Sequence, residues 1–184
     1  MARDEARILL IGLSESGKTS LLEAVKGAYV KGHRIAPPDA IPVTIGMNLL
    51  KIAVMDMDVT LWDVGGTMRK IWPQYYGEAD GVVFVVDASD RQQFGESCEA
   101  LREILQNTAT CPVLVLANKQ DLPHAARASE VIDAICKPAG LGVKETPRLY
   151  RVMEISALKS NSGESKEFLE WIVREARAGA LERQ

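Results

Sequence analysis

One eight-residue segment limits what this chain can fold into more than any other feature. Residues Gly12–Thr19 read G-L-S-E-S-G-K-T and match the pattern G-x-x-x-x-G-K-[ST]. The apolar run Arg7–Leu13 before it predicts a buried strand, and Lys18–Val30 after it has the spacing of a helix. A strand, a glycine-containing loop and a helix in that order predict a phosphate-binding loop in an α/β protein.

The residue types in this loop suit a polyphosphate. Glycines let backbone N–H groups approach phosphate oxygens, and the helix N-terminus adds the positive end of its dipole. Lys18 is expected to reach the β- and γ-phosphates, and the Thr19 hydroxyl to ligate Mg²⁺. A carboxylate repels phosphate, so we expect Glu15 to point to solvent. The predicted nucleotide-binding residues of the loop are Leu13, Ser14, Glu15, Ser16, Gly17, Lys18, Thr19 and Ser20.

The rest of the chain alternates strand-like and helix-like segments. This alternation predicts βαβ units and a mostly parallel sheet. Residues Gly27–Pro42, which contain three prolines, are long for a loop of a compact domain, and such loops are usually functional or mobile. Further strands are expected over Leu49–Met55, Asp58–Val64, Gly81–Asp87, Pro112–Ala117 and Leu149–Ile155, and helices over Ser89–Asn107, Ser129–Cys136 and Ser165–Ala180.

A second motif, Asn118-Lys119-Gln120-Asp121, follows the predicted strand Pro112–Ala117. The Asp121 carboxylate can accept hydrogen bonds from guanine N1–H and the exocyclic amine, a pair of donors that adenine lacks. A site built to bond a polar group rejects an analogue without it by roughly 10⁴–10⁵. We therefore expect Asn118, Lys119 and Asp121 to bind guanine. The alternative is an ordinary polar turn at a strand end.

Three further segments complete the predicted site. Asp63, in the segment W-D-V-G-G, ends a predicted strand, where ligands gather in α/β sheets, and it is expected to hold Mg²⁺ through water. Gly66 can bring its N–H against a γ-phosphate, and the Thr44 hydroxyl can ligate Mg²⁺ when GTP is present. Ser156 and Ala157 follow the last predicted strand and are expected to lie behind the guanine ring.

Charge and composition exclude other classes of protein. The 184 residues carry a net charge of −3 with a pI near 5.5, which does not fit a nucleic-acid-binding surface or a polybasic membrane patch. Cys98, Cys111 and Cys136 have no zinc or disulfide spacing, so we expect reduced, buried thiols. No apolar run is long enough to cross a bilayer, and residue 2 is alanine, so we expect no signal peptide, membrane span or N-myristoyl anchor.

The motifs together resemble those of the Arf and Arf-like small GTPases. They are G-L-x-x-x-G-K-T, T-I-G-x-N (Thr44–Asn48), W-D-V-G-G and N-K-Q-D-L (Asn118–Leu122), and the match covers essentially the whole chain. The stretch Gly65–Gly77 resembles one Arf-like subgroup in particular. The resemblance implies a Ras-like G domain, with a six-stranded, mostly parallel sheet flanked by helices, as a single domain over residues 1–184. It also implies binding of GTP or GDP with Mg²⁺.

The resemblance assigns further roles by position. Switch I contains Thr44, switch II begins near Gly66, and the hairpin Leu49–Val59 between them is the interswitch. The catalytic positions are Gly66, Thr67 and Lys18. The apolar triad that binds effectors falls on Met47, Trp62 and Tyr75. The alternative for the triad is a place in the core, since large apolar side chains are usually buried.

The chain departs from the family pattern at several positions. Thr67 stands where most of the family has the glutamine that orients the attacking water, and Trp72 arrives two residues early, so we expect very slow intrinsic hydrolysis. The segment from Thr19 to Thr44 is longer than in a typical Arf, and we expect no amphipathic helix before the first strand. Ser14 replaces the family's usual acidic residue.

Three functions remain open from the sequence. The first is a regulatory switch whose GTP state binds effector proteins, with an exchange factor and a GAP as further partners. The second is an adaptor that stays loaded with GTP, which Thr67 favours. The third, a small-molecule kinase, requires an arginine-rich lid that the sequence lacks. We expect a monomer that binds no nucleic acid, in the cytoplasm and peripheral to the Golgi or the cilium, with a role in membrane or ciliary traffic.

Overall fold

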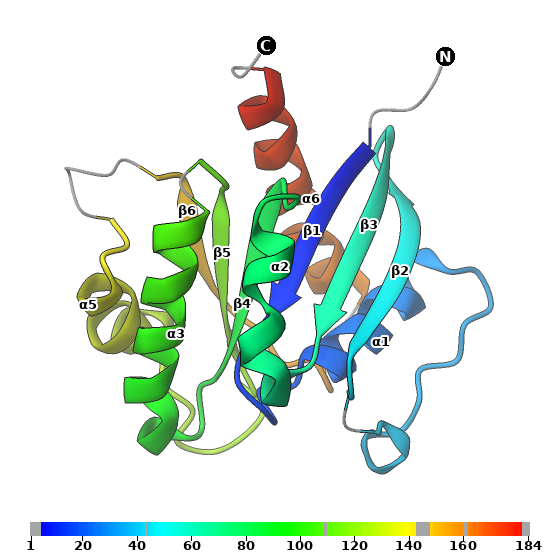
Figure 1. The fold of residues 1–184 in the computed structure, drawn as a ribbon. Helices are drawn as coiled ribbons and strands as arrows, with labels where there is room; N and C mark the ends of the chain where they lie inside the picture. The colour runs from blue at the N-terminus through cyan, green and yellow to red at the C-terminus, as the bar shows by residue number, and fades with distance from the viewer. Residues whose placement is uncertain (1–4, 43, 109, 143–147, 160–161, 182–184) are drawn as a thin grey trace.

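A computed structural model describes residues 5–42, 44–108, 110–142, 148–159 and 162–181. Its centre is one six-stranded sheet in the order β2-β3-β1-β4-β5-β6 (Figure 1). Only the β2–β3 pair is antiparallel, so the predicted six-stranded, mostly parallel sheet flanked by helices is confirmed. The strands are β1 (Glu5–Ile11), β2 (Met47–Val54), β3 (Met57–Val64), β4 (Gly81–Asp87), β5 (Val113–Asn118) and β6 (Tyr150–Glu154).

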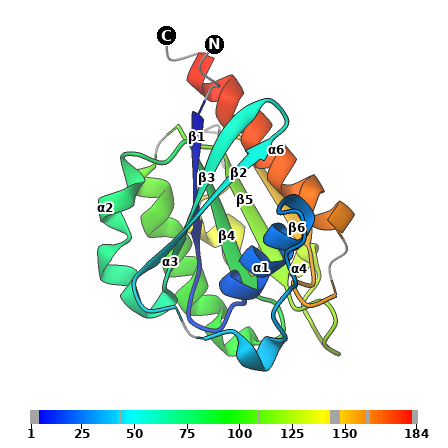
Figure 2. The same cartoon turned by 90° about the vertical axis from the view of Figure 1, so that its right-hand side faces the viewer.

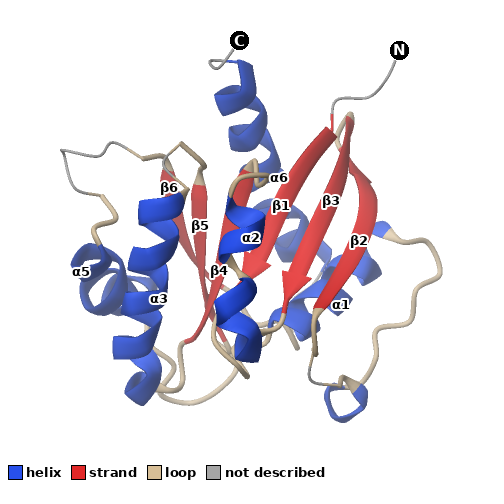
Figure 3. Cartoon of the chain, viewed as in Figure 1, coloured by secondary structure: helices blue, strands red, loops and turns tan. Residues whose placement is uncertain are grey.

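Helices cover both faces of the sheet, as Figures 2 and 3 show. The α-helices are α1 (Lys18–Tyr29), α2 (Pro73–Tyr76), α3 (Phe94–Asn107), α4 (Ala128–Val131), α5 (Lys137–Ala139) and α6 (Ser162–Leu181). A π-helical turn η4 (Ile132–Cys136) joins α4 to α5, and 3₁₀ turns form η1 (Pro38–Ala40), η2 (Gly66–Ile71) and η3 (Arg91–Gln93).

The hydrophobic pattern of the strands explains why helices pack on both faces of the sheet. Every residue of β4 and β5 is buried, because each of these strands is covered on both faces. Alternate residues of β1 divide between two cores: Leu9 and Ile11 pack with α3, whereas Ile8 and Leu10 pack with α1 and α6. In Figure 2 the sheet lies between α2 and α3 on one side and α1 and α6 on the other.

Several predicted boundaries were wrong; β1, for example, covers Glu5–Ile11 instead of Arg7–Leu13. The turn of the β2–β3 hairpin holds only Met55 and Asp56, because Met55 takes a positive φ of 53° that lets Val54 pair with Met57. The helix expected over Ser89–Asn107 is a 3₁₀ turn followed by α3, since the Asp90 side chain caps the turn first. The helix expected to end at Cys136 continues through Ala139.

The parallel strands place the predicted motifs along one edge of the sheet. The carboxyl ends of β1, β3, β4, β5 and β6 lie there, so the segments that follow them meet. Of the helices described, none has both the length and the apolar character that a bilayer span requires. Ala2, on which the expectation about acylation rests, lies outside the described residues.

Candidate functional site

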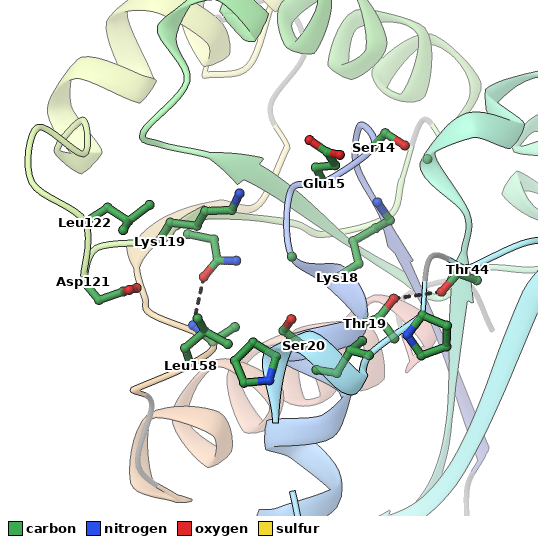
Figure 4. Close-up of a pocket in the computed structure, with 17 residues that line it drawn as sticks. Ser14, Glu15, Lys18, Thr19, Ser20, Thr44, Lys119, Asp121, Leu122 and Leu158 are labelled. Atoms are coloured by element: carbon green, nitrogen blue, oxygen red, sulfur yellow. Dashed lines mark hydrogen bonds between the residues drawn. The ribbon is translucent and has the colours of Figure 1, made fainter. Parts of the chain in front are cut away.

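A cavity of about 370 Å³ opens at the carboxyl edge of the sheet (Figure 4). In Figure 4 Lys18, Thr19 and Thr44 lie at one end, and Lys119, Asp121 and Leu122 at the other. The residues that line it come from five separate parts of the chain: Ser14, Glu15, Gly17, Lys18, Thr19, Ser20, Pro38, Ile41, Pro42, Thr44, Gly66, Asn118, Lys119, Asp121, Leu122, Ala157 and Leu158.

The loop after β1 requires glycine at Gly17, the residue directly before α1. Gly17 has a φ of 91°, and a Cβ there would lie 2.3 Å from Nδ2 of Asn118. Asn118 needs this close approach, because its amide donates to the carbonyl of Ser16 at 2.8 Å and its Oδ1 accepts from the N–H of Ala157 at 2.9 Å. The asparagine thus ties the loop after β1 to the loop after β6.

Lys18 lies under the loop and is only 5% exposed. Its Nζ donates to the carbonyls of Gly12 at 2.9 Å and Leu13 at 2.8 Å. Burial lowers the pKa of Lys18 to about 8, and the charge of Asp63 only partly opposes this effect. A buried ammonium beside a concave loop is arranged to bind an anion, because an incoming negative charge would restore the stabilisation lost on leaving water.

Asp63 and two hydroxyls meet beside Lys18. Oγ1 of Thr19 lies 2.8 Å from Oγ1 of Thr44, and these two atoms lie 3.4 and 3.3 Å from Oδ2 of Asp63. Burial raises the pKa of the Asp63 carboxyl, although bonds from Asn48, Thr44 and Thr19 and the charge of Lys18 oppose the rise.

The second oxygen of Asp63 makes these residues fit a metal. The side chain is fully buried, and Oδ1 has no hydrogen-bond partner within the part of the chain that the structure describes. A buried oxygen of this kind needs an explanation, and a bound cation or its water supplies one. A single carboxylate with two hydroxyls suits Mg²⁺, which keeps several waters and shares phosphate oxygens. The structure thus brings together Thr19, Thr44 and Asp63, the three residues that the sequence assigned to a metal.

The segment after β3 lies directly against the phosphate loop. A Cβ at Gly66 would lie 2.4 Å from the N of Ser14 and 2.5 Å from the carbonyl carbon of Leu13, so only glycine fits. The buried Trp72 donates from Nε1 to the carbonyl of Gly65 at 3.3 Å. Thr67, next to Gly66, is exposed, and it does not line the cavity.

The other end of the cavity is built from side chains of two loops. Oγ of Ser156 donates to Oδ1 of Asp121 at 2.5 Å, which orients the carboxylate. Nζ of Lys119 lies 2.6 Å from Oδ2 of Asp87, at the end of β4. Burial raises the pKa of Asp87, but the bonds from Lys119 and Ser89 outweigh it, so the net pKa is lowered and the carboxylate stays charged.

The structure brings most of the predicted residues together. Leu13, Ser16, Asp63 and Ser156 do not line the cavity, and they act from behind it through the bonds described above. Pro38, Ile41 and Pro42 line it from the long connection before β2, and Leu122 and Leu158 line its far end; sequence reasoning missed all five. The prolines before Thr44 marked the connection as unusual but gave no sign of where it folds.

The predicted effector triad lies at the surface beside β2 and β3. The Trp62 and Tyr75 rings meet edge to face with centroids 5.6 Å apart, and both are half-buried against the core. Met47 is 36% exposed. Leu49, directly opposite Trp62 across the β2–β3 pair, is 55% exposed, and the sequence prediction omitted it.

Comparison with known proteins identifies relatives. The sequence model of the ADP-ribosylation factor family matches residues 1–176. ADP-ribosylation factor-related protein 1 of Homo sapiens is 37% identical over 124 residues, which are 65% of this chain and 62% of that protein. Its counterpart in Rattus norvegicus is 36% identical over 143 residues, or 73% of this chain and 71% of that protein. The chain thus spans about 62% of the length of the human relative.

A solved structure has the same fold. It is described as the Arl6 BBS3 small GTPase from Trypanosoma brucei with the bound nucleotide analogue GppNp. The TM-score is 0.75 and the sequence identity 23%, with 95% of this chain and 99% of that chain covered.

Proposed function

The chain belongs to the ADP-ribosylation factor family, whose members bind GTP or GDP with Mg²⁺, and from this premise we propose that it is a GTP-binding switch protein. One observation carries the proposal. A single cavity is lined by a phosphate-type loop with its lysine and, at the far end, by an oriented carboxylate, and an oxygen set that fits Mg²⁺ lies beside the lysine. We propose that residues 1–184 act as one domain around this cavity.

Each residue has a distinct task in this proposal. The loop amides and Lys18 bind the polyphosphate, and Asp121 accepts from the paired donors of guanine. Thr19, Thr44 and, through water, Asp63 hold Mg²⁺, which when bound neutralises phosphate charge. Since Gly66 lies against the loop, its N–H is the group we expect to bond a γ-phosphate when GTP is present.

We propose that the protein hydrolyses GTP very slowly without help. Thr67 is exposed, and its side chain is too short to orient water as a glutamine does. Gly66 and Lys18 remain to stabilise charge on the transferred phosphoryl group. A GAP that supplies an arginine contributes about 10³–10⁵ in rate, so regulated turnover remains compatible with Thr67.

The exposure of Thr67 also favours a second function. A protein with negligible hydrolysis stays loaded with GTP and acts as an adaptor. The nucleotide content of the purified protein separates the two functions: released GDP in HPLC supports the cycling switch, whereas retained GTP supports the adaptor.

The binding surface follows from the same proposal. We propose that GTP-dependent effectors dock on Met47, Trp62 and Tyr75, with Leu49 beside them, because exposed Met47 and Leu49 and the half-buried rings form an apolar strip next to switch II. An exchange factor and a GAP complete the proposed partners. The proposed setting is the cytoplasm, at the Golgi or the cilium, in membrane or ciliary traffic, with the protein as a monomer.

Single-turnover hydrolysis tests the slow-hydrolysis proposal. Protein loaded with GTP and Mg²⁺ is sampled over time beside a family member that has the switch II glutamine. The expected rate constant lies well below that of the reference. An equal rate constant would refute the role given to Thr67.

A further inference from the structure

The connection between α1 and β2 is long, and it returns to the cavity. In Figure 1 it leaves α1, runs outside β2 and comes back at η1 to the carboxyl edge of the sheet. Figure 2, turned by 90°, shows η1 at the same edge. Pro38 in η1 and the following Ile41 and Pro42 then line the cavity, close in sequence to Thr44.

A polar cluster on α1 anchors the first half of this connection. Glu23 on α1 is only 9% exposed. Its Oε1 lies 2.6 Å from Nζ of Lys26 and its Oε2 lies 2.8 Å from Nε2 of His33, and, against the effect of burial, the backbone N–H of Ala36 helps these two groups to lower the pKa of the carboxyl. A buried carboxylate that bonds His33 fixes the path of the chain before Pro38.

An apolar contact anchors the connection at a second point. A Cβ at Gly27 would lie 2.7 Å from Cδ1 and 2.8 Å from Cγ1 of Ile35, so the Ile35 side chain rests on the bare backbone of α1. Ile35 is otherwise largely exposed, so few other contacts hold it. The two anchors lie on successive turns of α1, and they flank the same few residues of the connection.

We propose that Glu23, His33 and Ile35 are positioning residues that hold residues 37–42 over the nucleotide, so that they set the rate at which nucleotide dissociates. This inference rests on the proposed guanine-nucleotide site. Pro38, Ile41 and Pro42 line the cavity, so a nucleotide that fills it would lie against them, and in this proposal it leaves on their side. In this proposal the contacts of His33 and Ile35 with α1 break before residues 37–42 move away from the nucleotide. A variant that lacks one of these contacts therefore has a lower barrier to nucleotide dissociation.

Nucleotide dissociation tests the inference on the full chain. The protein is loaded with fluorescent mant-GDP in Mg²⁺ and chased with excess GDP. His33→Ala and Ile35→Ala are each expected to raise the dissociation rate constant by roughly three- to tenfold, the factor that corresponds to one net hydrogen bond or a modest apolar contact. The double variant is expected to release nucleotide faster than either single variant.

Three further variants separate positioning from general destabilisation. His33→Gln keeps a nitrogen donor near the place of Nε2, and it is expected to restore slow release. Gly27→Ala favours α1 because alanine is the better helix former, yet its Cβ displaces Ile35. It is therefore expected to release nucleotide faster without lowering the Tm. Arg34→Ala, at an exposed neighbour of His33, is the control and is expected to leave the rate constant unchanged.

The outcomes distinguish this inference from the proposed function. Wild-type rate constants in His33→Ala, Ile35→Ala and Gly27→Ala, or an equal rise in Arg34→Ala, would overturn the positioning role while leaving the nucleotide site intact. The positioning role would also be overturned if the dissociation rate constant rose in proportion to the fall in Tm across all variants. Failure of the wild-type protein to bind mant-GDP would overturn the proposed function itself.

Discussion

The phosphate end of the cavity, around Gly17 and Lys18, and the base end, around Asp121 and Leu158, differ in how they are built. Lys18 and Asp63 are buried in the fold, and glycines bring backbone into contact at the phosphate end. At the base end Asp121 is half-exposed, and Leu158 is 54% exposed. Changes at the buried end are therefore expected to affect every nucleotide, whereas changes at the exposed end are expected to affect the choice of base.

The largest expected effect is at the base end. Asp121→Asn replaces an acceptor by an amide that also donates, so the paired donors of guanine lose their partner. The preference for GDP over ADP is expected to fall by up to roughly 10⁴. Affinity for xanthosine diphosphate is expected to rise, since xanthine has a carbonyl in place of the exocyclic amine. Competition against mant-GDP measures both effects, with Asp133→Asn on the exposed face of η4 as the matched control.

The next largest effect is at the phosphate end. Lys18→Met removes the buried ammonium, and affinity for GDP, GTP and ADP is expected to fall by roughly 10²–10³ because charged hydrogen bonds to phosphate are lost. The ratio of GDP to ADP affinity is expected to stay as in the wild type. A change in that ratio, measured by calorimetry, would show that the phosphate end also affects the choice of base.

The pH dependence of binding sharpens the same comparison. The pKa of Lys18 is about 8 in the free protein, and phosphate charge raises it in the complex. Binding therefore takes up a proton above pH 8, and affinity falls as pH rises through that value. Between pH 7 and pH 9 the Kd for GDP is expected to rise by about tenfold. In Lys18→Met the Kd for GDP is expected not to depend on pH in this range. If the pH dependence were unchanged in this variant, it would belong to the titration of another group.

The smallest effect is expected at Glu15, on the rim of the phosphate end. This exposed carboxylate lines the cavity and repels phosphate through solvent. Glu15→Gln is expected to tighten GDP binding by roughly two- to fivefold at low ionic strength, and the gain is expected to shrink as salt screens the charge. Titrations at two salt concentrations check this, and a gain that is independent of salt would contradict it.

The sequence predicted the parts of the site that local backbone geometry controls. Lys18, Asp63 and Asn118 each follow or end a strand at a fixed offset, so their motifs placed them without knowledge of packing. The continuous apolar run of β4 likewise predicted its bounds, Gly81–Asp87, because a strand covered on both faces has one pattern.

The parts that the sequence missed depend on contacts between distant segments. Ile41 lines the cavity at the end of a connection that bonds through His33 to Glu23 on α1, and no local pattern encodes that path. Leu158 is exposed and apolar, and its place is fixed by the bond between Ala157 and Asn118. Met55 has a positive φ that residue preference disfavours, so the hairpin turn was predicted one residue too far along the chain.

Calorimetry of the wild-type protein with GDP, GTP and ATP in Mg²⁺ is the decisive test of a guanine-specific site. We expect saturable binding of GDP and GTP, with ATP unable to displace either at comparable concentrations. Binding of ATP as tight as that of GTP, or no heat with any guanine nucleotide, would contradict it.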